Sequence, residues 1–320
     1  MISASLLDHT CARFPEVSPA DIAVTPLEKG GSDRKFYRIA VDQQSGSSRS
    51  LILVKYGDQR EENRHYVEVA HFLSDHGINV PQIYHHDPAE GLIWMQDLGE
   101  IDLWAFRTEP WETRRAHYQK TLDQAARLHA LSTETSLQLQ PLFDETLYRW
   151  EQNYFFENCL GRHFGIEFDP SSIPMLEAIR HRLAEQPRVL VHRDFQSQNI
   201  MVRHDDAWLI DFQGMRPGLR QYDLASLLYD PYVDLTKSER SEMLTYYQSV
   251  AGISDPSTIE IFHACAVQRL MQALGAYGFL GHERGKPEFL RHIPKALTSL
   301  REVICEIDGL EKLSAVLEKC

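Results

Sequence analysis

The stretch that decides the fold is LVHRDFQSQNIMVRHDDAWLIDFQG, residues 190–214. It alternates short apolar runs, which favour β-strands, with polar breaks. Asp194 lies in the first break, Asn199 follows it by five residues, and Asp211 comes directly after the last apolar run. We expect these three side chains at the same end of a small sheet. Carboxylate and amide oxygens are ligands that Mg²⁺ prefers, so the stretch predicts a magnesium site.

The spacing of these residues matches a known arrangement. His-Arg-Asp-x-x-x-x-Asn followed by Asp-Phe is the phosphoryl-transfer template of the kinase fold. In that template Asp194 orients and deprotonates the acceptor hydroxyl, while Asn199 and Asp211 hold magnesium on the nucleotide phosphates. His-Arg-Asp alone is typical of a chance loop, and Asp211 alone of a helix cap. His192, Asp194, Asn199 and Asp211 together favour catalysis, with ATP and Mg²⁺ as cofactors.

The first hundred residues predict strands around one helix, residues 60–77. Lys55 lies at the end of the apolar strand LILVKY, as the template lysine does. A lysine in an apolar strand needs a partner, because burying its charge alone is costly. We expect Glu68, in the middle of the following helix, to be that partner. Glu61 and Glu62 are alternatives near the helix start, and a solvated helix face is the simpler role for Glu68.

Two further segments of this region are candidates for binding the nucleotide. KGGSDRKFYRI contains a Gly-Gly-Ser turn, in which the backbone N–H groups of Gly31 and Ser32 could approach phosphate oxygens. MQDLG is the expected hinge, where backbone groups near Gln96 and Leu98 would contact the adenine edge. A plain hairpin turn and a plain interdomain turn are the alternatives for these two segments.

Beyond residue 100 helical patterns predominate. The order predicts an α+β, two-lobed protein-kinase-like fold, with a small, mostly antiparallel β lobe carrying one helix and a larger, mostly α-helical lobe. We expect a nucleotide-binding lobe at 1–95, a hinge at 96–100 and a catalytic and substrate-binding lobe at 101–320, with the ligands in a cleft between lobes. The predicted helices are 111–136, 143–160, 171–186, 223–230, 238–251, 256–281 and 288–319, with a strand-rich island at 189–213.

Composition and charge exclude several classes of protein. The net charge of −13 argues against a nucleic-acid partner, which favours a basic face. Five cysteines without a C-x-x-C pair favour the reducing cytoplasm. The N-terminus has no signal-peptide pattern, and no window approaches roughly 18 uninterrupted apolar residues, so we expect no membrane partner. The sequence assigns no oligomeric state.

The motifs LVHRDFQSQNIM, LIDFQG and YDLASLLYD carry a family resemblance. Across residues from about 20 to about 310, the chain resembles the aminoglycoside phosphotransferase and choline kinase superfamily, whose fold is protein-kinase-like. Within it, HRDFQSQN followed by DFQGMRPG and YDLASLLYDPY is most similar to the bacterial cell-wall amino-sugar kinases. These phosphorylate the anomeric hydroxyl of N-acetylmuramate or N-acetylglucosamine, so the resemblance implies a sugar or amino-sugar substrate and a role in cell-wall recycling.

The chain departs from protein kinases in ways that concern the acceptor. No G-x-G-x-x-G loop or A-P-E motif is present, and Asp-Phe-Gly is replaced by Asp-Phe-Gln. Only eleven residues, 212–222, separate Asp211 from Asp223. That leaves no room for an activation loop and peptide platform, which favours a small-molecule acceptor. The resemblance makes Asp223 structural, and we expect it to be the N-cap of the following helix.

Two arginines just past Asp211 are candidates for contacting the acceptor. The guanidinium groups of Arg216 and Arg220 could meet a substrate carboxylate such as a lactyl group, because the Arg fork matches carboxylates. A surface position is the plain alternative for both residues. Arg216 is the one that we assign to the substrate.

Two other functions remain open on the sequence alone. An aminoglycoside antibiotic phosphotransferase needs an acidic acceptor pocket for its polycationic substrate, and the acidic composition permits one. A pseudokinase would bind nucleotide without chemistry, but the presence of Lys55, Asp194, Asn199 and Asp211 argues against it. Phosphorylation of a sugar or amino-sugar hydroxyl is the leading hypothesis.

Overall fold

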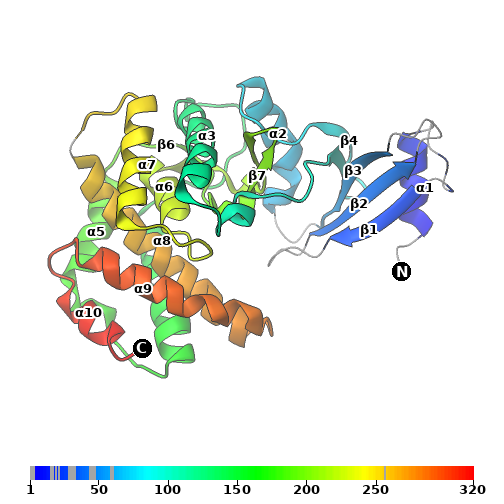
Figure 1. Cartoon of the computed structure of the whole chain (residues 1–320). Coiled ribbons are helices and arrows are strands. Elements are labelled where there is room, and N and C mark those ends of the chain that lie inside the picture. The colour runs from blue at the N-terminus through cyan, green and yellow to red at the C-terminus, as the bar shows by residue number, and fades with distance from the viewer. Residues whose placement is uncertain are drawn as a thin grey trace. The chain divides into compact units, whose positions relative to one another are not determined.

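The computed structural model describes residues 4–14, 18, 20, 22–27, 34–42, 48–57, 61–255 and 257–320 (Figure 1). Gly31 and Ser32, predicted to cover the phosphates, lie outside the described residues. The chain forms two compact units. Unit 1 is Met1–Glu100 with Trp208–Gln213, and unit 2 is Ile101–Ala207 with Gly214–Cys320. Asp211 therefore belongs to the unit formed by the first hundred residues.

Unit 1 is built on an antiparallel sheet of five strands in the order β1-β2-β3-β5-β4. Alternate residues of the strands face opposite sides, and on one side Ile39, Leu53 and Trp94 are buried in a common core. The predicted strand segments are thus confirmed, and residues 51–54 and 92–95 of the central strands are buried on both faces of the sheet. Their bounds are β1 Ile22–Leu27, β2 Lys35–Asp42, β3 Ser48–Lys55, β4 Ile83–Asp87 and β5 Leu92–Gln96.

A helix absent from the sequence prediction covers this face of the sheet. α1 (Ala4–Arg13) buries Leu6 in the same core, and the Trp94 indole N–H donates to the Thr10 hydroxyl at 3.0 Å. The expectation of one helix in this region is therefore wrong. The short polar sequence ASLLDHTCAR is a weak helix signal, and packing against the sheet supplies the stabilisation that its own pattern lacks.

The predicted helix of unit 1 begins later than its pattern suggested. Glu61–His65 forms a 3₁₀ turn, and α2 follows at Tyr66–Asp75. Tyr66, Val69, Ala70 and Leu73 are buried, as their helical spacing predicts. Gly77 ends the helix with a φ of +72°, a conformation that glycine adopts without steric cost.

Unit 2 is mostly helical, and its long helix α8 packs against α4, α6 and α9 (Figure 1). The prediction of one helical region at 288–319 is wrong: a 3₁₀ turn at Pro287–His292 precedes two separate helices. Between these helices Gly309, with a φ of +88°, breaks the helical path. The bounds are α3 Trp111–His129, α4 Glu145–Phe155, α5 Pro174–Ala184, α6 Arg220–Leu228, α7 Lys237–Val250, α8 Ser257–His282, α9 Ile293–Ile304 and α10 Glu311–Leu317, with a π-helix at Phe156–His163.

Two small sheets contain or flank residues 190–214, the stretch that carries Asp194, Asn199 and Asp211. β7 (Ile200–Arg203) and β8 (Asp206–Leu209) form a hairpin within the predicted strand-rich island, and both turn residues between them have positive φ, as a type I′ turn requires. β6 (Val189–Val191) pairs with β9 (Arg216–Gly218), a strand that the sequence did not predict. Gly218 is needed there because a Cβ would lie 2.6 Å from Val191.

Candidate active site

The loop that carries Asp194 is fixed on one side by a buried carboxylate of unit 2. Asp223 accepts the backbone N–H groups of His192 at 2.7 Å and of Arg193 at 2.8 Å. Arg193 has a φ of +78°, a strained conformation that these two charge-assisted hydrogen bonds offset. The predicted N-cap role of Asp223 is wrong: Leu219 is the N-cap of α6, and the Asp223 carboxylate is turned toward the loop.

A second buried carboxylate fixes the loop on the other side of Asp194. Asp230 accepts the backbone N–H of Ser197 at 2.8 Å and its hydroxyl at 2.5 Å. The backbone N–H of Tyr232 donates to the same side chain at 2.9 Å. The loop residues on both sides of Asp194 are thus held by groups within unit 2, which limits how far its backbone can move.

The charge environment of Asp194 keeps its carboxyl group ionised. Burial opposes ionisation, but the nearby positive charges of Arg193 and Arg269 outweigh it and lower the pKa of Asp194 below its ordinary value. An Asp194 oxygen lies 3.7 Å from the Arg193 guanidinium and 3.8 Å from that of Arg269. The side chain is still 34% exposed. An ionised, accessible carboxylate on a fixed loop is suited to accept the hydrogen of a hydroxyl group.

Asn199 is oriented by a hydrogen bond across the same loop. Its side-chain amide nitrogen donates to the backbone carbonyl of Asp194 at 2.9 Å. This contact leaves the amide oxygen of Asn199 as an available ligand for a cation. The structure therefore joins two of the predicted site residues, Asp194 and Asn199, in one turn of unit 2.

Asp211 lies in unit 1, where a buried arginine pairs with it. It follows β8 and has a φ of +64°. Its oxygen Oδ1 accepts from the Arg34 guanidinium and from the Gln213 side-chain amide, the latter at 3.0 Å. The next residue, Phe212, stacks on Tyr66 of α2 with ring centroids 4.8 Å apart. The sheet and α2 of unit 1 thus support the predicted metal ligand.

Asp211 in unit 1 and Asn199 in unit 2 each carry the kind of oxygen ligand that Mg²⁺ prefers, and their joint use in one metal site stays a prediction. Within the described ranges, no group of three or more His, Cys, Asp or Glu side chains gathers to hold a metal ion. Asp211 and Asn199 offer a carboxylate and an amide oxygen, which are hard ligands. Asp211 also already pairs with a cation, the guanidinium of Arg34.

Lys55 ends β3, where the sequence prediction placed it, and its side chain is exposed. It lies directly across from Lys35 of β2 in the sheet register. The structure does not bring Glu68 to it: the Glu68 carboxylate lies 3.5 Å from His65 and is 65% exposed. Because Glu68 points to solvent, it and Lys55 form no ion pair among the residues described here, and their pairing stays a prediction.

The expected hinge is braced by an arginine of the sheet. Arg38 of β2 donates to the Asp97 carboxylate at 2.7 Å and to the Gly99 carbonyl at 3.0 Å. Gln96 exchanges hydrogen bonds with Gln82, through its backbone N–H at 2.8 Å and its side-chain oxygen at 3.2 Å. The N–H of Gln96 is therefore engaged within unit 1. The predicted contact of backbone groups near Gln96 and Leu98 with adenine stays a prediction.

Arg216, assigned to the substrate on the sequence, is buried in unit 2. Its guanidinium lies 5.3 Å from the centre of the Phe143 ring, and its Nε donates to the Gly214 carbonyl at 3.3 Å. Its charge also contributes to lowering the pKa of Asp194. The plain alternative of a surface arginine is thus wrong, and a contact with a substrate carboxylate stays a prediction.

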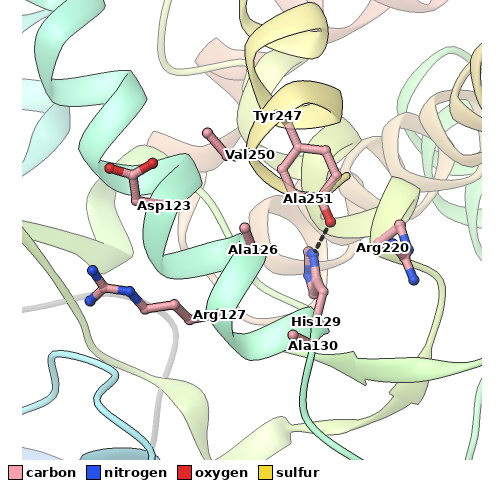
Figure 2. A pocket seen from close by; sticks show the side chains of 9 residues that line it. All are labelled: Asp123, Ala126, Arg127, His129, Ala130, Arg220, Tyr247, Val250 and Ala251. Atoms are coloured by element: carbon pink, nitrogen blue, oxygen red, sulfur yellow. Dashed lines mark hydrogen bonds between the residues drawn. The ribbon is translucent and has the colours of Figure 1, made fainter. Parts of the chain in front are cut away.

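A pocket of about 650 Å³ lies between α3 and α7 (Figure 2). His129 and Tyr247 contribute to its lining, with the Tyr247 hydroxyl 2.7 Å from the His129 imidazole. The other imidazole nitrogen lies 3.2 Å from Asp223. The pocket wall is therefore linked to the carboxylate that holds the Asp194 loop. The other lining residues are Asp123, Ala126, Arg127, Ala130, Arg220, Val250 and Ala251.

The sequence interpretation missed four residues that contact the candidate site residues or their supports. Arg34 stands far along the chain from Asp211, and Arg269 far from Asp194, so no local spacing signals either contact. His129 ends a helix whose pattern marks it as an ordinary apolar-face residue. Gln213 had a signal, since Gln replaces the Gly of Asp-Phe-Gly, and its side chain contacts both Arg34 and Asp211.

A family model for the phosphotransferase enzyme family matches residues 23–260 of this chain. The chain therefore belongs to that family. Two curated relatives are named N-acetylmuramate/N-acetylglucosamine kinase. The one from Pseudomonas aeruginosa is 28% identical over 94% of this chain and 89% of its own. The one from Neisseria meningitidis is 30% identical over 75% of each chain.

Solved structures share the fold at low sequence identity. A choline/ethanolamine kinase family protein from Mesorhizobium loti superposes with a TM-score of 0.64 at 15% identity, over 97% of this chain and 98% of that chain. An ADP-bound aminoglycoside phosphotransferase, APH(2'')-Ib, gives 0.62 at 14% identity, over 94% of this chain and 99% of that chain. The predicted two-lobed kinase-like fold is confirmed. No helix in the part of the chain described here is long and apolar enough to cross a membrane.

Proposed function

We propose that this phosphotransferase moves the γ-phosphoryl group of ATP to the anomeric hydroxyl of N-acetylmuramate or N-acetylglucosamine. The names of relatives that span most of the chain support this acceptor class. The observation that carries the proposal is the ionised Asp194 carboxylate on a loop fixed by Asp223 and Asp230. Such a group is what a kinase needs to receive a sugar hydroxyl.

Asp194 would accept a hydrogen bond from the acceptor hydroxyl and take its proton as the oxygen attacks phosphorus. The lowered pKa of its carboxyl keeps it unprotonated and ready at neutral pH. Because the loop is held by hydrogen bonds that pre-exist, the group needs little reorganisation to reach this position. Catalysis then rests on positioning and on charge, without a covalent enzyme intermediate.

Asn199 and Asp211 would hold Mg²⁺, which when bound neutralises charge on the nucleotide phosphates. Lys55 would contact phosphate oxygens, with Gly31 and Ser32 covering them through backbone N–H groups. Glu68 would turn toward Lys55 once nucleotide is present. Leu98 would contact the adenine edge through its backbone, with Gln96 bracing that segment. Arg216 would serve the acceptor, directly or through the charge it places near Asp194.

The charges near Asp194 weigh against an aminoglycoside as acceptor. Arg193 and Arg269 both lie within 4 Å of the Asp194 carboxylate, and a polycationic substrate would approach these like charges unfavourably. A neutral or anionic sugar meets no such repulsion. The likeness to aminoglycoside phosphotransferases concerns the fold, at 14% identity. ATP as donor and five free thiols support the cytoplasm as the compartment.

An acceptor panel tests the proposal. The purified protein is incubated with Mg·ATP and, separately, N-acetylmuramate, N-acetylglucosamine, choline and kanamycin, and the products are followed by ³¹P NMR. We expect an acid-labile sugar phosphate, with phosphorus coupled to the anomeric proton, from the amino sugars alone. Turnover of kanamycin or choline in place of the amino sugars would reject the proposed acceptor. ATP binding without transfer to any acceptor would support the pseudokinase hypothesis instead.

A further inference from the structure

Arg34 is a buried cation beneath an accessible carboxylate. Its side chain is 7% exposed, whereas that of its partner Asp211 is 35% exposed. The guanidinium donates to Asp211 Oδ1 and, at 3.0 Å, to the side-chain oxygen of Gln213, and it lies 5.5 Å from the centre of the Phe36 ring. The pair is thus built into unit 1 on one side and open to approaching ligands on the other.

The proposed metal ion would bind the carboxylate that Arg34 already holds. Asp211 Oδ1 accepts from both Arg34 and Gln213, so its lone pairs are engaged in this structure. A divalent cation that binds the other oxygen of Asp211 lies beside a guanidinium of like charge and weakens its hold on the carboxylate. A buried guanidinium that loses part of its counter-charge is costly unless another anion approaches it. Metal binding alone therefore weakens a favourable pair.

The neighbouring residues supply a reason for an anion to bind at this point. Lys35 follows Arg34 directly and lies opposite Lys55 in the β2–β3 register. Two like charges in directly opposite positions of a sheet destabilise it, and an anion between them removes that cost. Arg34, Lys35 and Lys55 together place three positive charges at one end of these strands. A nucleotide phosphate chain carries the opposite charge, and the Arg34 fork suits its oxygens.

We propose that Arg34 exchanges partners when the metal–nucleotide complex binds. In the free protein it holds Asp211; when Mg²⁺ takes the Asp211 carboxylate, the guanidinium contacts a phosphate of the nucleotide. The Arg fork suits both partners, since carboxylate and phosphate present similar pairs of oxygens. Arg34 is then a nucleotide-binding residue that also makes binding of free metal unfavourable. This inference rests on the proposed use of ATP and Mg²⁺ but not on the identity of the acceptor.

Binding of Mn²⁺ and ADP, measured without an acceptor, tests the exchange. Mn²⁺ substitutes for Mg²⁺ and is counted by electron paramagnetic resonance, first with Mn²⁺ alone and then with Mn·ADP. In Arg34→Gln we expect Mn²⁺ alone to bind about tenfold more tightly than in wild type, because no cation competes for Asp211. We expect Mn·ADP to bind about tenfold more weakly, because a phosphate contact is lost. These two changes have opposite signs.

Two further variants separate the exchange from a structural role. Arg34→Lys keeps the charge but loses the fork, and it should shift both affinities in the same directions by smaller factors; it also serves if Arg34→Gln does not fold. Arg13→Gln removes another Arg–Asp pair of unit 1, with Asp87 at 2.9 Å, and should leave both affinities unchanged. Circular dichroism checks folding of each variant.

The outcomes distinguish this inference from the proposed function. If Arg34 only stabilises unit 1, loss of Arg34 will weaken both kinds of binding together or change neither, and the exchange is rejected. If wild type binds no Mn·ADP at all, both the exchange and the kinase function are rejected. If the affinities shift oppositely but no amino sugar is phosphorylated, the exchange holds and only the proposed acceptor fails.

Discussion

The imidazole of His129 lies 3.2 Å from the carboxylate of Asp223, and its other nitrogen lies 2.7 Å from the hydroxyl of Tyr247. Since a carboxylate only accepts, the imidazole nitrogen facing Asp223 donates to it. Asp223 also receives the N–H groups of His192 and Arg193. A continuous buried network therefore runs from α7 to the loop that carries the proposed catalytic base.

Replacing Asp223 with Asn should loosen this loop. The amide keeps the shape of the side chain but loses the charge and turns one acceptor into a donor that faces other donors. We expect unfolding free energy to fall by about 2–4 kcal/mol and turnover to fall as well, measured by urea denaturation and steady-state kinetics. Asp169→Asn, at an exposed cap on Ser171, is the matched control. Unchanged stability in Asp223→Asn would show that the hydrogen bonds of Asp223 to the loop do not stabilise the fold.

Asp194→Asn should remove catalysis and leave nucleotide binding nearly intact. Asn has the size of Asp but cannot take a proton, and general-base contributions are typically about 100-fold or more. We expect kcat to drop by at least that factor, with ADP affinity within about threefold of wild type. Asp205→Asn, in the β7–β8 turn where both residues tolerate positive φ, is the control. Equal turnover in Asp194→Asn would remove Asp194 from the mechanism.

Arg269→Gln should shift the acid side of the pH–rate profile upward. Burial raises the pKa of the Asp194 carboxyl, and the positive charge of Arg269 is among those that lower it below its ordinary value. The base works only when ionised, so activity is lost as pH falls through its pKa. Without Arg269 that pKa rises, and kcat/KM should begin to fall at a higher pH than in wild type. Arg269→Lys keeps the charge and should keep the wild-type profile, whereas an identical shift in both variants would point to packing.

Glu151→Gln should flatten the dependence of stability on pH. Burial raises the pKa of Glu151 from 4.5 to about 7. Between these values the native state retains a proton that the unfolded chain has released, so stability falls as pH rises through this range. The full effect is of order 3 kcal/mol above pH 7. Gln resembles the protonated carboxyl, which keeps the Tyr222 hydroxyl hydrogen bond of 2.6 Å.

Urea unfolding at several pH values from 5 to 8 measures the Glu151 effect. The difference in stability between Glu151→Gln and wild type should grow with pH in favour of the variant. The same substitution at exposed Glu177 is the control, and its curve should run parallel to that of wild type. A pH-independent difference for Glu151→Gln would mean that burial does not raise the pKa of this carboxyl above its value in the unfolded chain.

Most of the fold follows from local patterns, and the exceptions have physical reasons. The strand at Lys35–Asp42 and the helix at Lys237–Val250 show the periods that their burial requires, and Ser48–Lys55 contains a continuous apolar run that is buried. α1 is stabilised by the sheet that it covers, which a local pattern does not contain. β9 contains Pro217 and Gly218, residues disfavoured in strands. It is stabilised by pairing with β6, whose buried backbone groups require hydrogen-bond partners.

The candidate site was predictable where its chemistry is local in sequence. The spacing of Asp194 and Asn199 within one loop gave both residues, and the structure joins them by a hydrogen bond. The contacts of Arg34 and Arg269 join segments far apart in the chain, so only the tertiary structure shows them. The mid-helix position of Glu68 predicts it as the partner of Lys55. Spacing along a helix does not determine the direction in which a long side chain points.

The assignment of Trp208–Gln213 to unit 1 decides how the protein can be divided. A fragment ending at Glu100 would lack Asp211 and would leave Tyr66 without the Phe212 ring that stacks on it. Limited proteolysis after Glu100 would yield two pieces that do not fold independently, because the second piece carries Trp208–Gln213, which completes unit 1. Split versions of this enzyme should therefore regain activity on mixing only when the piece beginning at Ile101 is intact.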